Sequence, residues 1–273
     1  MLLLSCGFVV RVWCAGEVRY QLDIGCGRLN ESSLLTIQSI DRVEVHADGE
    51  RQFSMVMLES VQNNIYRGAR QQYVCSQSIN LYQSPKREGL VTQVDAQDHL
   101  RLLEIAEAKG ALRVCSCKDD YLGWIAASHL QDLTPTDQRY QPPVVTAVEI
   151  QQKVPQVIAF TQAAMATSNK YLWGGATAPN YDCSGLMQAA YCNVGVQLPR
   201  DSYQQEDFTE RVEQANLLPG DLVFFGTPER TTHVALYLGD GRYIHSSGKD
   251  KGRNGIGIDS LTDLSHPVSQ SYF

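Results

Sequence analysis

A short proline-containing segment divides this chain into two stretches with different hydrophobic patterns. Pro135, Pro142 and Pro143 stand close together, and proline both blocks regular strand pairing and stiffens the chain. Short β-like runs precede this segment, whereas helical and strand-like runs both follow it. The 273 residues are enough for about two domains. We therefore expect a domain boundary here, with a linker over residues 135–150.

The composition excludes two classes of partner. Hydrophobic residues make up 43% of the chain and charged residues 19%, which fits a globular protein with a sizeable core. The formal net charge of −7 has the wrong sign for a protein that binds phosphate backbones. No apolar run approaches the roughly 18 residues needed to span a membrane. We expect neither a nucleic acid nor a membrane partner.

The first 56 residues are assigned to neither domain. Residues 1–6 superficially resemble a lipoprotein signal, but Cys6 follows with no basic residue and no apolar core of about 7–15 residues before it. Residues 30–54 are polar and show no sustained period, and two methionines follow them. We hypothesise that residues 1 to about 54 are an upstream extension of the reading frame, and we expect a cytoplasmic protein.

Five of the eight cysteines invite a metal or redox interpretation that their spacing does not support. Cys6, Cys14 and Cys26 lack the paired C-x₂-C spacing of a zinc site. Cys115 and Cys117 would share one face of a strand, but two thiolates do not complete a tetrahedral site. We expect structural or incidental thiols, no metal and no cofactor.

Residues 70–134 predict a small all-β domain. Leu112 and Val114 alternate with Arg113 and Cys115, which is typical of a half-buried strand. Turn residues separate several of the strand-like runs, and about 60 residues with five short strands predict a small barrel. The expected strands are Tyr73–Cys75, Asn80–Tyr82, His99–Leu103, Ala111–Cys117 and Gly123–Ala127.

The C-terminal half predicts two helices, and a cysteine opens the second. The first is expected over Pro155–Ser168, with proline in its first turn and an apolar stripe of Val157, Phe160, Ala164 and Met165. From Cys183 onward, Leu186, Ala190 and Val194 recur at helical spacing and Gly195 is a natural stop.

The position of Cys183 at a helix start favours its thiolate, which is the nucleophilic form of cysteine. Unpaired N–H groups and the positive end of the helix dipole stabilise the anion there. The alternative is a small buried thiol, the common state of cysteines, and Cys192 fits that description. We interpret Cys183 as the candidate nucleophile.

Two histidines downstream are candidate bases. The run 233–246 predicts a hairpin. A three-residue loop would pair Leu238 with Arg242 and make His233 and His245 diagonal neighbours on one face. A two-residue loop would put the two rings on opposite faces. The geometry therefore predicts an odd loop or a bulge.

These histidines fit a general base with its orienting partner. His233 would activate the thiol, and His245 would fix the tautomer of His233. A metal site is the alternative, but no carboxylate or third histidine has an evident place beside the pair, and only Asp182 and Cys183 could be recruited. We favour the base.

Five motifs now combine into a family resemblance that covers most of residues 155–260. The chain is similar to the NlpC/P60 cysteine peptidases in Tyr171-Leu172-Trp173-Gly174-Gly175, Asp182-Cys183-Ser184-Gly185-Leu186, Pro219-Gly220-Asp221-Leu222-Val223-Phe224-Phe225, His233-Val234-Ala235-Leu236-Tyr237-Leu238-Gly239 and Tyr243-Ile244-His245-Ser246-Ser247. Asn80–Pro85, with Gly123-Trp124-Ile125 and Leu130, resembles a bacterial SH3-like domain. Together they most resemble the γ-D-glutamyl-L-diamino acid endopeptidases, especially the cyanobacterial type.

The resemblance implies an α+β fold: a small SH3-like β-barrel followed by a papain-like NlpC/P60 catalytic domain over residues 151–273. It makes Cys183 the nucleophile, His233 the base and His245 the third polar residue. The implied substrate is a murein stem peptide, L-Ala-γ-D-Glu-diamino acid, cut at the γ-D-glutamyl-L-diamino acid bond. Such enzymes prefer a free N-terminal L-Ala, which implies cell-wall peptide recycling.

The resemblance also implies a substrate pocket to which the SH3-like module contributes a tyrosine. Asp201 could bind the free ammonium group, although capping a helix is its alternative role. The backbone N–H of Cys183 is the expected oxyanion donor. The implied substrate-binding residues are Tyr121, Tyr171, Trp173, Asp182, Ser184, Asp201 and Ser202.

Two departures and two alternatives accompany this interpretation. Lys86 and Arg87 stand where relatives often have an acidic residue, with Glu88 as a substitute, and relatives continue past Phe273, so we expect a truncated C-terminus. A secreted hydrolase of intact peptidoglycan is one alternative, which the expected lack of a signal disfavours. A catalytically silent protein that binds wall fragments is the other, and the complete set of thiol and imidazoles disfavours it.

Overall fold

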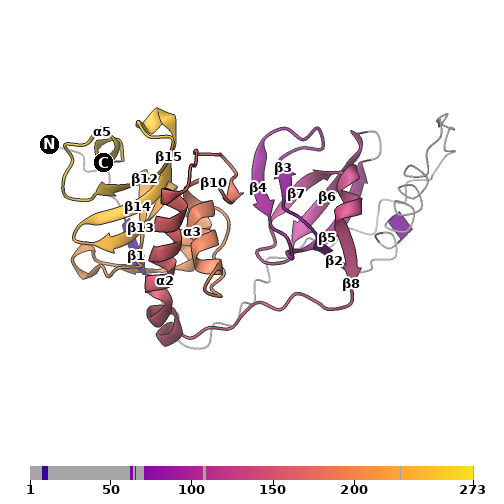
Figure 1. Cartoon of the computed structure of the whole chain (residues 1–273), viewed down its shortest axis with the longest axis horizontal. Coiled ribbons are helices and arrows are strands. Elements are labelled where there is room, and N and C mark those ends of the chain that lie inside the picture. The colour runs from indigo at the N-terminus through magenta and orange to yellow at the C-terminus, as the bar shows by residue number, and fades with distance from the viewer. Residues whose placement is uncertain are drawn as a thin grey trace.

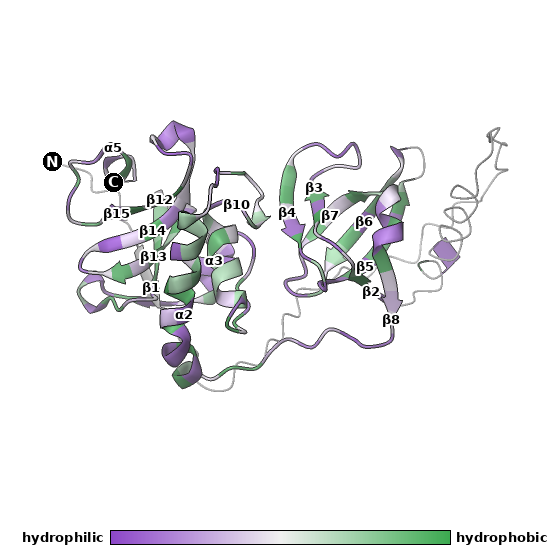
Figure 2. Ribbon diagram, viewed as in Figure 1, coloured by the Kyte–Doolittle hydropathy of each residue, from purple (hydrophilic) through white to green (hydrophobic). Residues whose placement is uncertain are grey.

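The computed structural model describes residues 8–11, 62–63, 65, 71–106, 109–227 and 229–272. Figure 1 shows two bodies joined by an extended segment that leads from β8 to α2. In Figure 2 hydrophobic residues concentrate on the strands and on α2 and α3. In the parts of the chain given above, no helix has the length and apolar character needed to cross a membrane.

The first body is a seven-stranded antiparallel sheet with the strand order β4-β3-β7-β6-β5-β2-β8. It closes around its own core of buried side chains, among them Leu81, Leu112 and Ile125. All five expected strands are present, together with two more. The strands are β2 (Gln72–Cys75), β3 (Ile79–Tyr82), β4 (Leu90–Val94), β5 (His99–Ala106), β6 (Ala111–Ser116), β7 (Leu122–Ala126) and β8 (Leu133–Thr136), and the 3₁₀ helix Ala127–Asp132 lies between β7 and β8.

The sequence did not reveal β4 and β8, and the structure explains why each was missed. Pro135 lies in β8, which pairs only with β2 at the edge of the sheet, where an absent N–H is tolerated. The expected linker therefore begins after Thr136. In β4, Thr92 and Gln93 interrupt the apolar pattern because they bond to the second body.

The alternation expected in β6 holds for its apolar residues. Leu112 and Val114 are fully buried. Cys115, expected on the outer side with Arg113, is buried as well. Burial raises the pKa of Cys115 to about 11 and that of Cys117 to about 12, so both thiols stay protonated at neutral pH.

The second body is a six-stranded antiparallel sheet with the order β11-β1-β12-β13-β14-β15. Helices α2 and α3 share a hydrophobic core with strands β12 to β15. The strands are β1 (Phe8–Arg11), β11 (Glu210–Val212), β12 (Leu222–Thr227), β13 (Arg230–Gly239), β14 (Arg242–Ser247) and β15 (Gly255–Ser260), and β9 (Ala176–Thr177) with β10 (Asn180–Tyr181) forms a small ribbon. The helices are α2 (Ala147–Ala166), α3 (Cys183–Cys192), α4 (Ser202–Phe208) and α5 (Pro267–Gln270), with 3₁₀ turns at Gln214–Asn216 and Lys249–Lys251.

Helix α2 begins two turns earlier than the sequence indicated. Thr146 caps it, since its hydroxyl accepts from the Glu149 N–H and its N–H donates to the Glu149 carboxylate. Pro155 consequently lies inside the helix instead of in its first turn, which corrects the expected helix start. The predicted stripe is confirmed: Val157 is in the core, and Phe160, Ala164 and Met165 pack against it.

Strand β1 lies in the N-terminal region that the sequence assigned to neither domain. The backbone of Phe8–Arg11 pairs antiparallel with β11 on one side and β12 on the other. These four residues therefore belong to the second body's sheet. The remaining candidates of that region, including Cys6, Cys14, Cys26 and residues 30–54, lie outside the described residues.

The two bodies touch where β4 meets the turn before β9. The Gln93 side-chain oxygen accepts from the N–H groups of Ala176 at 3.0 Å and Thr177 at 3.3 Å. Gly174 has a φ of +78°, and a Cβ there would lie 2.6 Å from the carbonyl oxygen of Leu90. Only glycine allows this approach of the two backbones.

Replacing Gly174 with alanine should therefore weaken the contact between the bodies. We expect Gly174→Ala to lower the free energy of unfolding by about 1–3 kcal/mol through overpacking and backbone strain, measured by urea denaturation. Gly110→Ala is the control, because Gly110 has a φ of +56° but nothing within 4 Å of its Cβ position. Equal losses in the two variants would show that the contact with Leu90 contributes nothing.

Candidate active site

Cys183 occupies the first turn of α3, as the sequence predicted. Asp182 is the N-cap residue, and its Oδ1 accepts from the Gly185 N–H at 2.7 Å. Cys183 itself is 7% exposed. The backbone N–H groups of Val234 and Ser184 donate to its sulfur. The thiol is therefore held at a helix start and against strand β13.

Burial dominates the acidity of this thiol. Desolvation, followed by the negative charge of Asp182, raises the pKa of Cys183 to about 12, against the opposing hydrogen bonds from the backbone. The helix start alone predicted the opposite direction. In the free protein Cys183 is therefore a thiol at neutral pH and needs a base to become a nucleophile.

The two histidines meet through a bulge in the β13–β14 hairpin. Tyr237 lies opposite Tyr243, whereas Gly239 lies opposite Arg242. One extra residue, Leu238, is thus accommodated in β13, and the loop itself has two residues. The predicted pairing of Leu238 with Arg242 is wrong, but the predicted bulge is confirmed. It keeps His233 and His245 on one face, where His233 Nε2 and His245 Nδ1 are 2.7 Å apart.

A carboxylate that the sequence did not reveal completes the chain of polar groups. His245 Nε2 lies 2.7 Å from Asp259 Oδ2 in β15. An ionised carboxylate only accepts, so this nitrogen carries the proton and His245 Nδ1 accepts from His233 Nε2. His233 Nδ1 is then the unprotonated nitrogen of that ring. Asp259 could have been found by register, because Tyr243 pairs with Asp259 two residues from His245.

Both imidazoles are neutral in this environment. Burial, with the charges of His245 and Lys251, lowers the pKa of His233 well below its ordinary value. Burial lowers the pKa of His245 too, although Asp259 opposes it. Burial raises the pKa of Asp259, but His245 and Arg253 more than offset this, and its pKa is lowered.

The ring of Tyr272 covers the candidate base. It stacks on His233 with the ring centroids 4.2 Å apart and the planes at 19°. Its hydroxyl is 2.6 Å from the Ser247 hydroxyl. Tyr272 was not among the predicted site residues, because nothing local in the sequence connects it with His233.

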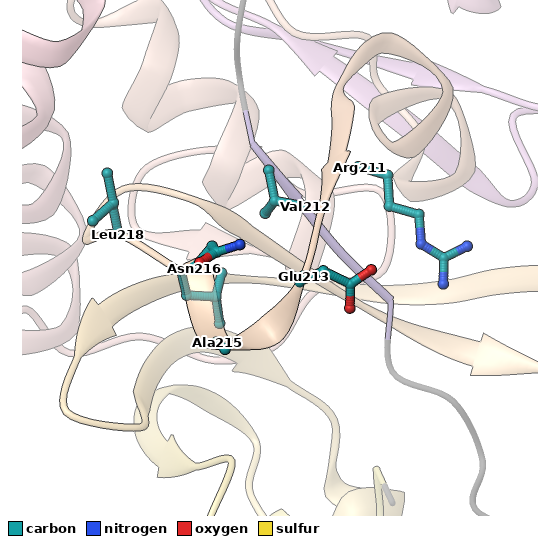
Figure 3. Close-up of a pocket in the computed structure, with 7 residues that line it drawn as sticks. Arg211, Val212, Glu213, Ala215, Asn216 and Leu218 are labelled. Carbon is teal, nitrogen blue, oxygen red and sulfur yellow. The ribbon is translucent and has the colours of Figure 1, made fainter.

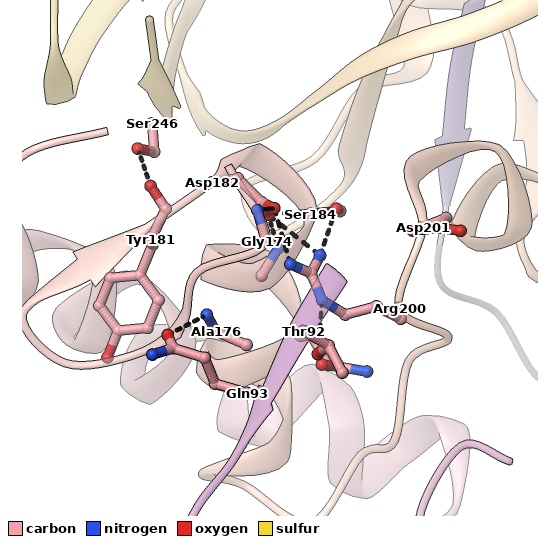
Figure 4. Close-up of polar contacts among 12 residues, drawn as sticks. Thr92, Gln93, Gly174, Ala176, Tyr181, Asp182, Ser184, Arg200, Asp201 and Ser246 are labelled. Atoms are coloured by element: carbon pink, nitrogen blue, oxygen red, sulfur yellow. Dashed lines mark hydrogen bonds and ion pairs between the residues drawn. The ribbon is translucent and has the colours of Figure 1, made fainter. Parts of the chain in front are cut away.

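Asp182 and Ser184 are committed to contacts within the protein. Arg200, which is 1% exposed, donates to both carboxylate oxygens of Asp182, at 3.0 and 2.6 Å, and to the Ser184 hydroxyl at 2.9 Å. Asp182 also accepts from the Gly174 N–H at 2.8 Å. Arg200 Nε donates to Thr92 of β4 at 2.9 Å, so this network spans the two bodies (Figure 4).

A cavity of about 500 Å³ opens in front of Cys183, between the two bodies. The first body contributes Gln83, Val91 and Tyr121 to its wall. The Tyr121 hydroxyl donates to the Asp201 carboxylate at 3.3 Å. Every predicted substrate-binding residue lines this cavity: Tyr121, Tyr171, Trp173, Asp182, Ser184, Asp201 and Ser202.

The lining residues differ in how they can meet a ligand. Trp173 is 73% exposed, so its ring stands at the rim. Asp201 is half-buried at the start of α4, where its N–H donates to Gln204. Burial raises the pKa of Asp201, which favours a partner with a positive charge. His233 faces an adjoining cavity of about 450 Å³ that shares Tyr171 and Trp173 with the first.

A third hollow lies away from these residues. It has a volume of about 670 Å³ and is lined by the single segment 211–218, from Arg211 to Leu218 except Gln214 (Figure 3). This lining contains neither a thiol nor an imidazole. The hollow therefore lacks both the thiol that lines the cavity around Cys183 and the imidazole that lines the adjoining cavity.

Two families of known domains match the chain. Residues 168–272 match the sequence model of the NlpC/P60 family, and residues 81–130 match that of the bacterial dipeptidyl-peptidase Sh3 domain. The chain therefore carries an NlpC/P60 domain of papain-like fold behind an SH3-like domain, as the motifs indicated.

Individual relatives and one solved structure match shares of the chain that differ in size. The murein DD-endopeptidase MepS/murein LD-carboxypeptidase of Escherichia coli is 34% identical over 34% of this chain and 48% of its own length. The bifunctional muramidase/DL-endopeptidase CwlT of Bacillus subtilis is 38% identical over 28% and 25%. A crystal structure of an NlpC/P60 family protein from Bacillus cereus is 22% identical with a TM-score of 0.40, covering 77% of this chain and 64% of that one. The chain spans about half of the length of MepS and about a quarter of the length of CwlT.

Alkylation tests whether the pKa of Cys183 is raised. We expect iodoacetamide to modify Cys183 slowly at pH 7, and we expect the rate to keep rising up to pH 10, because only the thiolate reacts and burial keeps the pKa at about 12. Mass spectrometry of the Cys183 peptide measures the rate. The same peptide in denaturant should level off near its ordinary pKa of about 8.5. Fast alkylation that levels off below pH 6 would show a preformed ion pair instead.

Removing the guanidinium of Arg200 should destabilise the folded protein. We expect Arg200→Met to lower the free energy of unfolding by about 3–5 kcal/mol, because it leaves the buried Asp182 charge unpaired. The double variant Arg200→Met with Asp182→Asn should recover part of that loss. Denaturant titration measures both variants, and a single variant as stable as the unaltered protein would contradict the assigned role.

Proposed function

We propose that this chain, which carries an NlpC/P60 domain behind an SH3-like domain, is a cysteine endopeptidase of murein peptides that cleaves the γ-D-glutamyl-L-diamino acid bond. The observation that carries the proposal is the chain of groups from His233 through His245 to Asp259, next to a cavity that both Cys183 and the Asp201 carboxylate line. The SH3-like domain contributes Gln83, Val91 and Tyr121 to the wall of that cavity, and the catalytic domain provides the rest.

The acyl side of the substrate would occupy the cavity of about 500 Å³. A free N-terminal ammonium group would pair with Asp201, in the position where the Tyr121 hydroxyl already donates to it. Arg230 also lines this cavity and could meet the free α-carboxylate that a γ-linked D-glutamate retains. Opposite charges at two points would fix the peptide with its scissile carbonyl at Cys183.

The chemistry follows from the neutral starting state. His233 Nδ1 takes the proton of the Cys183 thiol as the sulfur attacks the carbonyl carbon. The Cys183 backbone N–H, at the start of α3, would stabilise the oxyanion. The protonated His233 then gives its proton to the leaving amine, the C–N bond breaks, and water hydrolyses the remaining thioester. His245 and Asp259 hold His233 in the correct tautomer throughout.

The relatives support the class of substrate more than the bond. MepS is named a murein DD-endopeptidase and CwlT a DL-endopeptidase. A γ-D-glutamyl-L-diamino acid bond joins a D-residue to an L-residue, so it agrees with the second name. Asp201 lines the same cavity as Cys183, and pairing with the free amine of the acyl part would agree with this choice.

A requirement for a free amine would restrict the enzyme to released peptides. In intact peptidoglycan the amine of L-Ala is acylated and carries no charge for Asp201. We propose that the chain acts in the recycling of such peptides in the cytoplasm. A secreted hydrolase of intact peptidoglycan and a silent binder of wall fragments are the alternatives that the following experiment separates.

Incubation of the purified chain with L-Ala-γ-D-Glu-meso-diaminopimelate tests the proposal. We expect release of L-Ala-D-Glu, abolished in Cys183→Ala, and a loss of about 10- to 100-fold in kcat/KM in Asp201→Asn, the size of one charge-assisted contact. The N-acetylated peptide should be cut as poorly by the unaltered chain as the free peptide is by Asp201→Asn. Liquid chromatography with mass spectrometry measures the products.

Each alternative has its own signature in this assay. Binding of the peptide without any product would establish the silent binder. Equal cleavage of the free and N-acetylated peptides, with release of peptides from purified sacculi, would establish the hydrolase of intact wall. Full activity in Cys183→Ala would overturn the thiol mechanism itself.

A further inference from the structure

The cavity beside His233 adjoins the one beside Cys183. Its volume is about 450 Å³. It shares Tyr171, Trp173 and Thr232 with the cavity that Asp201 lines, so the two are halves of one groove divided by these side chains. None of the residues in the predicted pocket other than Tyr171 and Trp173 lies in this half.

This half is the leaving-group side of the groove, an inference that rests on the proposed function. Asp201 and Tyr121 lie in the other half, where the ammonium group of the acyl part would bind. The chain beyond the scissile bond must then leave Cys183 in the opposite direction. His233, which hands its proton to the leaving amine, lines this second half. The diamino acid would therefore enter it.

Two opposite charges stand at the wall of this half. Asp250 and Lys251 follow each other in the 3₁₀ turn Lys249–Lys251. Lys251 Nζ lies 5.4 Å from the centroid of the Tyr272 ring and 3.4 Å from the Ser271 carbonyl oxygen. Burial lowers the pKa of His233 most, the charge of His245 comes second, and the charge of Lys251 lowers it further.

Asp250 faces the same space with its carboxylate free. Its Oδ1 lies over Gly248, at the point where a Cβ would stand, and Tyr171 borders that point at 3.7 Å. Within the described parts of the chain, Asp250 has no hydrogen bond or ion pair with a side chain. Two charges of opposite sign at one wall are complementary to a group that carries both an ammonium and a carboxylate.

We propose that Asp250 and Lys251 form a subsite for the zwitterionic end of a diaminopimelate side chain, with Asp250 receiving its ammonium group and Lys251 its carboxylate. Lysine ends in an ammonium group alone, so it satisfies Asp250 and leaves Lys251 unpaired. The subsite therefore selects meso-diaminopimelate over L-lysine at the position after the scissile bond.

The ratio of kcat/KM for two peptides tests this subsite. The peptides are L-Ala-γ-D-Glu-meso-diaminopimelate and L-Ala-γ-D-Glu-L-Lys. We expect the unaltered chain to prefer the first about tenfold or more, the effect of one hydrogen bond to a charged group. Lys251→Gln should reduce the ratio to about one. Asp250→Asn should lower both values by a similar factor, because both peptides present the ammonium group.

Lys249→Gln is the matched control, since it removes the same charge from the same turn, at an exposed residue that does not line the cavity. It should leave the ratio unchanged. A change in His233 basicity caused by Lys251→Gln would alter both peptides equally and cancel in the ratio. No preference in the unaltered chain, or a ratio that Lys251→Gln leaves intact, would overturn the subsite. Cleavage of neither peptide would instead overturn the proposed function, and the subsite with it.

Discussion

The buried ion pair between Arg200 and Asp182 holds the site together. Burying two charges costs more than their attraction returns unless hydrogen bonds satisfy the remaining donors and acceptors. Here they do: Asp182 also caps α3 and accepts from Gly174, and Arg200 also donates to Ser184 and to Thr92 of the first body. One network thus fixes the helix that begins with the thiol, one wall of the groove, and the position of the SH3-like domain.

The second organising feature is the row of polar groups from His233 through His245 to Asp259. Asp259 determines which nitrogen of His245 carries a proton, and His245 determines the same for His233. Burial keeps the thiol and both rings neutral. The site stores no thiolate, so activation of Cys183 is coupled to the presence of a substrate carbonyl that can receive the sulfur. Tyr272 shields the base from solvent by stacking on it.

Much of the fold was accessible from local patterns, and the misses share one cause. The five strands of the first body follow from alternation and turn residues, whereas β4 was hidden by Thr92 and Gln93, polar residues whose partners lie in the second body. Pro135 and Pro155 suggested a linker and a helix start. The structure places one on a sheet edge and the other inside α2, because the cost of a missing N–H depends on what surrounds it.

For the site, the sequence by itself determined the elements that depend on neighbours along the chain. Helical spacing placed Cys183 at a helix start, and the period of two required the bulge that brings His233 and His245 together. Only the tertiary structure decided that Arg200 and Asp259 are their supports and that the thiol is protonated. Periodicity reports which face a residue occupies, but burial and pairing energies arise between segments far apart in sequence. No local pattern contains them.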